Sequence, residues 1–257
     1  MVTLRLRLIR EHNRLYKFWM RLLWRICGLN SPIVLMVHGF KPSQELCKNS
    51  FEITGASFER IISYLMNSGW RAMTRKQLLN GQWRRKSFYI TFDDTYDTVY
   101  SEAYPILKRY QIPFTMFVTK DLVDKLGFIT SDHLKELAKD KLCSIGGHGM
   151  QHAVFRNLTE EETTQQCREE QKWFEEVFGI SAELFAFPYG RIVEVSGRNR
   201  RQLRNMGYKM VFSAIEGTLQ SSWFTGGYFL PRVNVSEKFV EKFIAGKFPE
   251  FKDCEGR

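Results

Sequence analysis

Short apolar runs recur along this chain, and each ends abruptly at polar or turn-forming residues. Such bounded runs are typical of buried strands. They predict strands near 33–37, 71–74, 88–92, 113–118, 143–146, 184–187, 209–213 and 229–233. Segments with helical spacing separate many of them, at 57–67, 97–109, 131–140, 159–178 and 195–206. Strands that alternate with helices predict an α/β fold built on a parallel sheet.

Two adjacent carboxylates, Asp93 and Asp94, stand where the apolar run 88–92 ends. Neighbouring residues of a strand point to opposite faces. Two such carboxylates can therefore take different roles, one binding a cation and the other transferring protons. Considered alone, the pair is better explained as a strand followed by an acidic helix cap.

A pair of imidazoles, His148 and His152, follows another short strand-like run. Two histidines and one carboxylate leave open positions on a divalent cation, which is the ligand set of a catalytic metal site. Histidines at this spacing also occur on surface helices without any metal. The Gly-Gly before the pair and Gly149 within it argue against a regular helix and favour a loop shaped around a ligand.

Two further strand-like runs end at residues with useful chemistry. One stops at a Pro-Tyr-Gly turn, whose rigid backbone could direct the Tyr189 amide toward a developing oxyanion. An ordinary strand-to-loop turn is the alternative. The other run ends at His38, which could serve as a general acid. Because the carboxyl ends of the strands form the catalytic face of a (β/α) barrel, we expect all of these motifs to meet at one mouth.

These motifs resemble those of the polysaccharide deacetylases of carbohydrate esterase family four, metal-dependent enzymes that remove N- or O-acetyl groups from sugars. The similarity runs roughly from Ile33 to Val235. It is most specific in Thr91-Phe-Asp-Asp94, His148-x-x-x-His152 and Phe185-Ala-Phe-Pro-Tyr-Gly190. The resemblance implies a distorted (β/α) barrel of about seven strands, of the deacetylase type.

The resemblance also implies a role for each candidate residue. Asp93 would be the general base, while Asp94, His148 and His152 would bind zinc or another divalent ion. Cobalt, nickel, manganese or iron also suits such a ligand set. A metal-activated water would then attack the acetyl group.

The motif that ends at His38 resembles that of a permuted subgroup, in which the catalytic-acid histidine lies near the N-terminal end. His38 would therefore protonate the leaving amine, and the Tyr189 amide would hold the oxyanion.

Three positions depart from the usual family pattern. Thr95 stands where glycine is usual, and Gly149 gives up a hydroxyl that commonly follows the first histidine. Ala186 replaces an arginine that orients the base in many members. Arg232 is the candidate substitute for that cation, although a surface arginine beside a strand is an equal alternative.

The charge of the chain is concentrated at its N-terminus. The net charge is +10, and residues 1–30 hold seven Lys or Arg and one acid. Their basic residues recur at spacings of three and four between apolar ones, which predicts an amphipathic helix. Such a helix either lies on an anionic membrane surface or packs on the barrel. Charges interrupt every apolar run here, so neither a signal peptide nor a membrane span fits.

Length and composition favour a single catalytic domain at 31–247, with the amphipathic segment 1–30 before it and a short tail at 248–257. Five scattered cysteines are typical of reduced thiols, which favours a cytoplasmic location, peripheral to the inner face of a membrane if the N-terminal helix binds lipid.

The sequence therefore predicts a metal-dependent hydrolase that removes an N-acetyl group from a saccharide. Two alternatives stay open. One is a hydrolase of a non-sugar amide on the same fold. The other is a basic membrane- or nucleic-acid-binding module without catalysis, but no recognised nucleic-acid motif accompanies the basic residues, so nucleic acid is not the expected partner. The sequence leaves the particular sugar and the oligomeric state open.

Overall fold

The computed structural model of this chain describes residues 30–247. The predicted amphipathic segment, apart from Asn30, and the predicted tail at 248–257 lie outside these described residues. Within them, no helix combines the length and the apolar character needed to cross a bilayer. The cysteines of the described chain, Cys47, Cys143 and Cys167, are free thiols.

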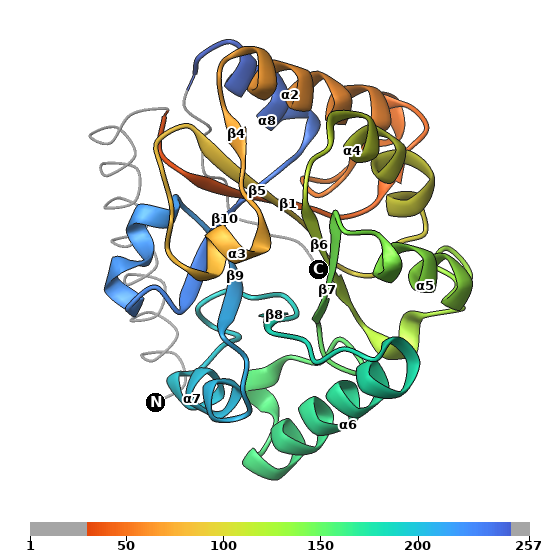
Figure 1. The fold of residues 1–257 in the computed structure, drawn as a ribbon, viewed down its shortest axis with the longest axis vertical. Coiled ribbons are helices and arrows are strands. Elements are labelled where there is room, and N and C mark those ends of the chain that lie inside the picture. The colour runs from red at the N-terminus through yellow and green to blue at the C-terminus, as the bar shows by residue number, and fades with distance from the viewer. Residues whose placement is uncertain (1–29, 248–257) are drawn as a thin grey trace.

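Seven parallel strands of residues 30–247 close into a barrel with helices around it (Figure 1). Each barrel strand pairs with the next one along the chain, and the last pairs with the first. The barrel strands are β1 (Ile33–Val37), β5 (Ser87–Phe92), β6 (Phe114–Val118), β7 (Cys143–Gly147), β8 (Leu184–Ala186), β9 (Met210–Glu216) and β10 (Phe229–Asn234). The predicted (β/α) barrel of about seven strands is confirmed.

The helices of the described chain connect these strands on the outside of the ring (Figure 1). They are α2 (Gly55–Asn67), α3 (Arg75–Leu79), α4 (Tyr104–Tyr110), α5 (Ser131–Lys139), α6 (Glu160–Phe178), α7 (Gly197–Asn205) and α8 (Glu237–Ile244). The five helices expected from the sequence form close to their predicted bounds. The segment expected to be helical from residue 97 becomes helical at a π-helical turn, Val99–Ala103, that leads into α4.

Several small elements escaped the sequence analysis. A two-stranded sheet, β2 (Phe40–Lys41) with β3 (Ile53–Thr54), follows β1. The strand predicted at 71–74 is present only as the short β4 (Arg71–Ala72), which pairs with the first residues of β5 and lies outside the ring. The missed helices α3 and α8 each begin at a hydroxyl cap, a signal that could have located them.

Alternation along the strands divides the core into two parts. One buried cluster consists mainly of strand residues and fills the barrel interior, and it includes Val34, Tyr89, Phe117, Phe212 and Leu230. The other cluster joins the outward residues of the strands to the apolar faces of the helices. Side chains on a strand alternate between the two faces. The inward-facing positions that fill the barrel interior are therefore followed, at the carboxyl ends of the strands, by the polar residues of the barrel mouth.

One join in the ring is thin. Strand β8 has three residues, and it meets β7 through a single residue pair of the described sheet, Gly147 opposite Phe185. Neighbouring β6 and β7 pair along five residues. The barrel is therefore least supported by backbone pairing between β7 and β8.

Close packing at Gly146 yields a stability prediction. A Cβ at this position of β7 would lie 2.6 Å from the ring of Phe117 and 3.0 Å from the Leu184 carbonyl oxygen. We expect Gly146→Ala to lower the free energy of unfolding by about 1–3 kcal/mol, since overpacking forces neighbours to shift. Denaturant unfolding measures the change.

Gly197→Ala is the matched control for this experiment. Gly197 opens α7, and a Cβ there would meet only an arginine side chain at 3.7 Å. Its effect should be neutral or stabilising by up to about 1 kcal/mol. Equal losses in the two variants would contradict the packing argument.

Candidate active site

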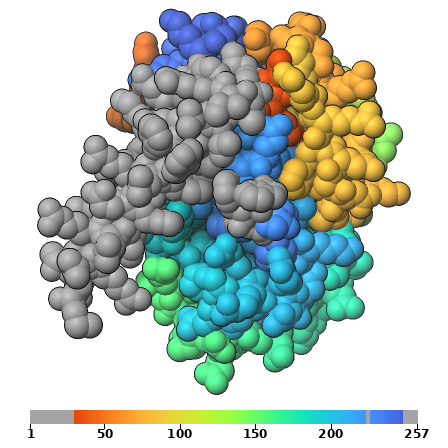
Figure 2. All heavy atoms as spheres, turned by 90° about the vertical axis from the view of Figure 1, so that its left-hand side faces the viewer, coloured from red at the N-terminus to blue at the C-terminus, as the bar shows by residue number. Residues whose placement is uncertain are grey.

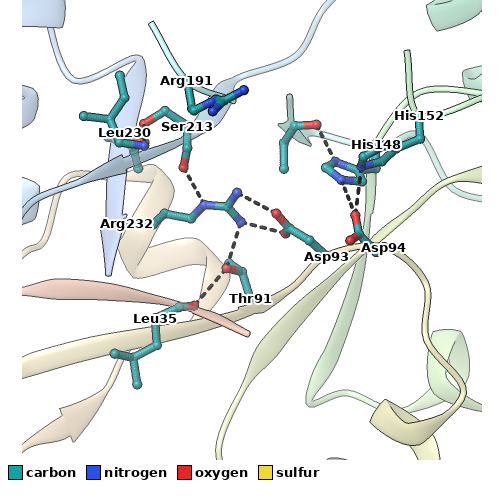
Figure 3. Close-up of polar contacts among 12 residues, drawn as sticks. Leu35, Thr91, Asp93, Asp94, His148, His152, Arg191, Ser213, Leu230 and Arg232 are labelled. Atoms are coloured by element: carbon teal, nitrogen blue, oxygen red, sulfur yellow. Dashed lines mark hydrogen bonds and ion pairs between the residues drawn. The ribbon is translucent and has the colours of Figure 1, made fainter. Parts of the chain in front are cut away.

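The candidate residues lie at the carboxyl ends of the barrel strands. Figure 3 shows five of them close together, namely Asp93, Asp94, His148, His152 and Arg232. Asp93 and Asp94 follow β5, and His148 follows β7. Arg232 belongs to β10, while His38 and Tyr189 follow β1 and β8. The convergence arises because parallel strands end at the same edge of a barrel.

A buried ion pair joins Asp93 to Arg232. The two terminal nitrogens of Arg232 donate to the two carboxylate oxygens of Asp93, each at 2.7 Å. Both side chains are almost inaccessible, with exposed fractions of 4% for Asp93 and 1% for Arg232. The geometry is the bidentate one that makes arginine–carboxylate pairs strong.

Two further donors of Arg232 are bound as well. Its Nε donates to the Ser213 carbonyl at 2.7 Å, and a terminal nitrogen lies 3.2 Å from the Thr91 hydroxyl (Figure 3). Its guanidinium also stands over the rings of Phe117 and Phe212. The barrel wall thus fixes the arginine, and the arginine fixes Asp93.

This pairing controls the acidity of Asp93. Burial alone would raise the pKa of the carboxyl, but the charge of Arg232, aided by His148, holds that pKa below its usual range. Asp93 is therefore ionised at neutral pH although it is buried. It stands as a carboxylate at the mouth of the barrel.

A second cluster consists of Asp94, His148 and His152. The Nε2 atoms of both imidazoles face the same oxygen of Asp94, at 3.3 Å for His148 and 2.9 Å for His152. Their potential ligand atoms all lie within 4.8 Å of one another. Among the described residues, this is the group of side chains that could hold a metal ion.

The chemistry of this donor set fits a divalent cation. The Nδ1 of His148 lies 2.7 Å from the Ala186 carbonyl oxygen, which can only accept, so Nδ1 carries the proton. In neutral His148 the lone pair of Nε2 then faces the Asp94 oxygen. Two facing lone pairs require a proton or a cation between them. A carbonyl that orients a ligating imidazole is also the usual support of a metal site.

The pKa directions agree with this picture. Burial opposes the charged forms, but the hydrogen bond to Asp94 raises the pKa of His148, and the two imidazoles hold the pKa of Asp94 well below its usual range. The cluster therefore attracts positive charge, either as protons or as a cation that replaces them.

His38 stands at the end of β1, next to the end of β5, where the Asp93 amide donates to the Val37 carbonyl at 2.9 Å. Its ring packs edge-on against Phe51, with 4.8 Å between centroids. Burial lowers the pKa of His38, although the nearby charges of Asp94 and Asp93 oppose the shift. Its Nδ1 is buried without a hydrogen-bond partner among the described residues.

Tyr189 belongs to a strained turn beside the histidines. The residue is 47% exposed, and its ring lies edge-on to His152, with 4.7 Å between centroids. Its φ of 59° lies in the left-handed region, as does that of Gly190. Among the described residues, the Tyr189 amide makes no backbone hydrogen bond outside the helices and strands.

Left-handed backbone recurs in the other motifs. Asp94, Thr95 and His152 have φ values of 65°, 62° and 54°. Such conformations are uncommon in residues with a Cβ and concentrate at functional sites. The φ of Thr95 explains why glycine suits this position. Here the buried Thr95 hydroxyl accepts a 2.7 Å hydrogen bond from the Thr119 amide, which stabilises the turn.

The sequence analysis missed Glu170, a fully buried acid on α6 that reaches the histidine loop. Its carboxylate accepts hydrogen bonds from the backbone amides of His148 and Gly149 and from the Tyr208 hydroxyl. A signal for it exists, since Glu170 interrupts the buried stripe of Thr163, Cys167 and Phe174 on α6. An acid on the buried face of a helix is rare unless it has partners.

Three arginines of α7 are engaged by the protein itself, which bears on the nucleic-acid-binding alternative. The helix lies on the face shown in Figure 2. Arg200 and Arg204 stack over aromatic rings, and Arg198 donates to a backbone carbonyl. These contacts favour a structural role for the helix.

The fold and the grouped residues define a (β/α) barrel with a candidate metal centre and a buried, ionised carboxylate at its mouth. The model of the polysaccharide deacetylase family matches residues 80–211, just over half of the chain. This protein therefore belongs to the polysaccharide deacetylase family.

Known proteins agree with this assignment. A poly-beta-1,6-N-acetyl-D-glucosamine N-deacetylase of Staphylococcus aureus is 26% identical over 225 residues, which cover 81% of this chain and 75% of the relative. The structure of IcaB from Ammonifex degensii matches with a TM-score of 0.71 at 24% identity, over 84% of this chain and 97% of that one.

A second solved structure supports the same fold. The Streptococcus pyogenes deacetylase PplD, in complex with acetate, matches with a TM-score of 0.74 at 20% identity, over 85% of this chain and 99% of that one. At such identities the two structures establish the fold of this chain and nothing finer.

The Asp93–Arg232 pair generates a prediction for stability and pH. We expect Arg232→Met to cost about 3–5 kcal/mol of unfolding free energy, because it leaves a buried carboxylate without its partner. In the native protein, the low pKa of Asp93 contributes stability that is lost only as the pH falls through that pKa. In the variant, burial without the cation raises the pKa, so stability is lost as the pH rises through the raised value.

The free energy of unfolding, measured at pH 5 and pH 8, distinguishes these two opposite dependences of stability on pH. The variant should be weakened more at pH 8 than at pH 5 relative to the native protein. Adding Asp93→Asn to Arg232→Met removes the titrating group and should abolish that difference. A loss that is the same at both pH values would contradict the proposed control of Asp93 by Arg232.

Proposed function

We propose that this protein is a metal-dependent hydrolase that removes the N-acetyl group from an acetylated saccharide. The observation that carries the proposal is the juxtaposition of two clusters. A buried carboxylate kept ionised by Arg232 is adjacent in sequence to a carboxylate that faces two imidazoles. One cluster suits proton transfer and the other suits cation binding.

Asp94, His148 and His152 are the residues that would hold the cation, for which zinc is the expected choice. When bound, a divalent cation supplies Lewis acidity, which polarises an acyl carbonyl and makes water a better nucleophile at neutral pH. Three protein ligands leave room for water and substrate, as catalytic sites require.

Asp93 is the proposed general base. It is held as a carboxylate by Arg232, so it can accept the proton of the attacking water without first losing one. The bidentate contact fixes its orientation as well as its charge. Arg232 thereby takes the orienting role that Ala186 cannot supply.

His38 is the proposed general acid, and the Tyr189 amide is the proposed oxyanion donor. An amine leaves an acylated centre readily only when it is protonated, and the half-buried imidazole of His38, close to both aspartates, is placed for that transfer. The rigid turn around Tyr189 presents its N–H without reorganisation, which is the requirement for stabilising a developing charge.

The sugar in this proposal is supported by the family and by a relative whose name specifies poly-beta-1,6-N-acetyl-D-glucosamine. An amide of a non-sugar on the same fold is the alternative. Acetate release from N-acetylglucosamine oligomers, compared with N-acetylated amino acids, separates the two. Release from the second group alone would reject the saccharide.

The predictions that concern residues 1–30 stand as predictions, because the structure describes only Asn30 of that segment. Association with an anionic membrane surface and a cytoplasmic, peripheral location are proposed from its basic, amphipathic sequence. Liposome flotation of the protein with and without these residues tests the association.

The assignment of base and ligands predicts different failures for two variants. Asp93→Asn should abolish measurable acetate release while the protein still binds its cation, because it changes the base and leaves the ligands. His148→Ala should lose the cation itself. Metal content after dialysis, together with acetate release after reloading, checks both expectations. Native turnover in Asp93→Asn would contradict its role as base.

The role of His38 predicts a dependence on the leaving group. We expect His38→Gln to slow hydrolysis of an N-acetylated sugar by about 10²–10⁴-fold, the usual contribution of a general acid. Hydrolysis of 4-nitrophenyl acetate should change far less, because nitrophenolate leaves without a proton. Equal losses on the two substrates would assign His38 to another role.

A further inference from the structure

Glu170 holds the backbone from which the two candidate histidine ligands project. One oxygen of its carboxylate accepts from the His148 amide at 3.0 Å and from the Gly149 amide at 2.7 Å. The other accepts from the Tyr208 hydroxyl at 2.8 Å. Three donors therefore converge on one fully buried acid.

The approach of this carboxylate depends on a glycine. A Cβ at Gly147, the residue before the first histidine, would overlap the Glu170 carboxylate. Glycine also permits the φ of 80° at Gly149, directly after that histidine. The two glycines thus allow a carboxylate from α6 to reach amides that a loop of larger residues would cover.

Glu170 also explains how the loop tolerates the loss of a hydroxyl at position 149. In the family pattern described above, a hydroxyl residue commonly follows the first histidine. Gly149 has no side chain that could make such a hydrogen bond. Here an acceptor from the neighbouring helix binds the loop amides instead. Without Glu170 the buried Gly149 amide would lose its acceptor, and the His148 amide would keep only the Val118 carbonyl at 3.1 Å.

The loop conformation determines where the imidazoles point. The His148 amide also lies 3.1 Å from the Val118 carbonyl, so the residue is bound at its backbone to both β6 and α6. Its ring is bound at Nδ1 to Ala186. With backbone and ring both fixed, Nε2 is directed at Asp94.

We propose that Glu170 is a positioning residue of the metal site, which acts through the backbone of His148 and Gly149 rather than as a ligand. The inference rests on the proposed function, since it assumes that Asp94, His148 and His152 bind a cation. Under this proposal, cation affinity depends on a hydrogen-bond acceptor at position 170, which lies outside the sequence motifs that hold the candidate ligands.

Glu170→Met tests the proposal. Methionine has a similar length and fills the same space, but it cannot accept the two amide hydrogen bonds. We expect the affinity for Zn²⁺, measured by competition with a chromophoric chelator, to fall about ten- to a hundred-fold, the usual effect of losing a group that orients ligands. Glu170→Gln keeps one acceptor oxygen for the amides and should stay within about threefold of the native affinity.

Two further variants separate positioning from stability. Tyr208→Phe removes the third hydrogen bond of Glu170 but leaves both amides bound. Cys167→Ala makes a small cavity on the same buried face of α6, one turn away. Both should lower the melting temperature of the metal-free protein and leave Zn²⁺ affinity nearly unchanged. A loss of affinity in Glu170→Met no larger than in these controls overturns the proposal.

If Glu170→Met does not fold, Glu170→Asp takes its place. Aspartate keeps the carboxyl group but withdraws its oxygens by one methylene, so it cannot reach both amides. Native Zn²⁺ affinity in that variant also overturns the proposal. A native protein that binds no cation would instead reject the proposed function, and the two failures are thereby distinguished.

Discussion

The organisation of the barrel mouth depends on one buried ion pair, that of Arg232 with Asp93. Burying a carboxylate is unfavourable unless a partner compensates for the lost hydration, and a guanidinium needs acceptors for its own donors. The barrel wall supplies these acceptors at Ser213 and Thr91. A carboxylate that would otherwise be protonated is thereby kept charged although it is almost inaccessible to solvent. Its neighbour Asp94, directed to the other side by the strand end, is left to the histidines.

Much of the barrel mouth could be predicted from the sequence, because buried strands leave a regular pattern of apolar runs. Apolar runs located the barrel strands, and the polar residues that end them fell at the same edge because parallel strands align their carboxyl ends. The expected roles of His38 and Tyr189 stay predictions, although both residues lie where the chain order of the strands implies. Arg232 illustrates the limit of this reasoning. Its side chain could have faced solvent, and only the inward alternation of β10, through Leu230 and Arg232, directs it to Asp93.

Contacts between elements distant in sequence were beyond such reasoning. Glu170 lies on α6, more than twenty positions after His148, and no spacing rule relates the two. The short β4 and the two-stranded sheet after β1 were missed or overextended for a related reason, since two-residue strands leave no periodic pattern. The π-helical turn before α4 also has no sequence signature of its own. Sequence-based prediction fails where tertiary contacts determine the local structure.

The weak backbone pairing between β7 and β8 gives the side chain of His148 a second role, in closing the barrel. With one residue pair joining these strands, the hydrogen bond from the His148 ring to the Ala186 carbonyl acts as an additional rung across the gap. A candidate metal ligand is thus also part of the barrel closure. A ligand that binds only the closed ring draws the population toward it. Under the proposed function, a cation held by His148 would therefore favour closure of the ring between β7 and β8.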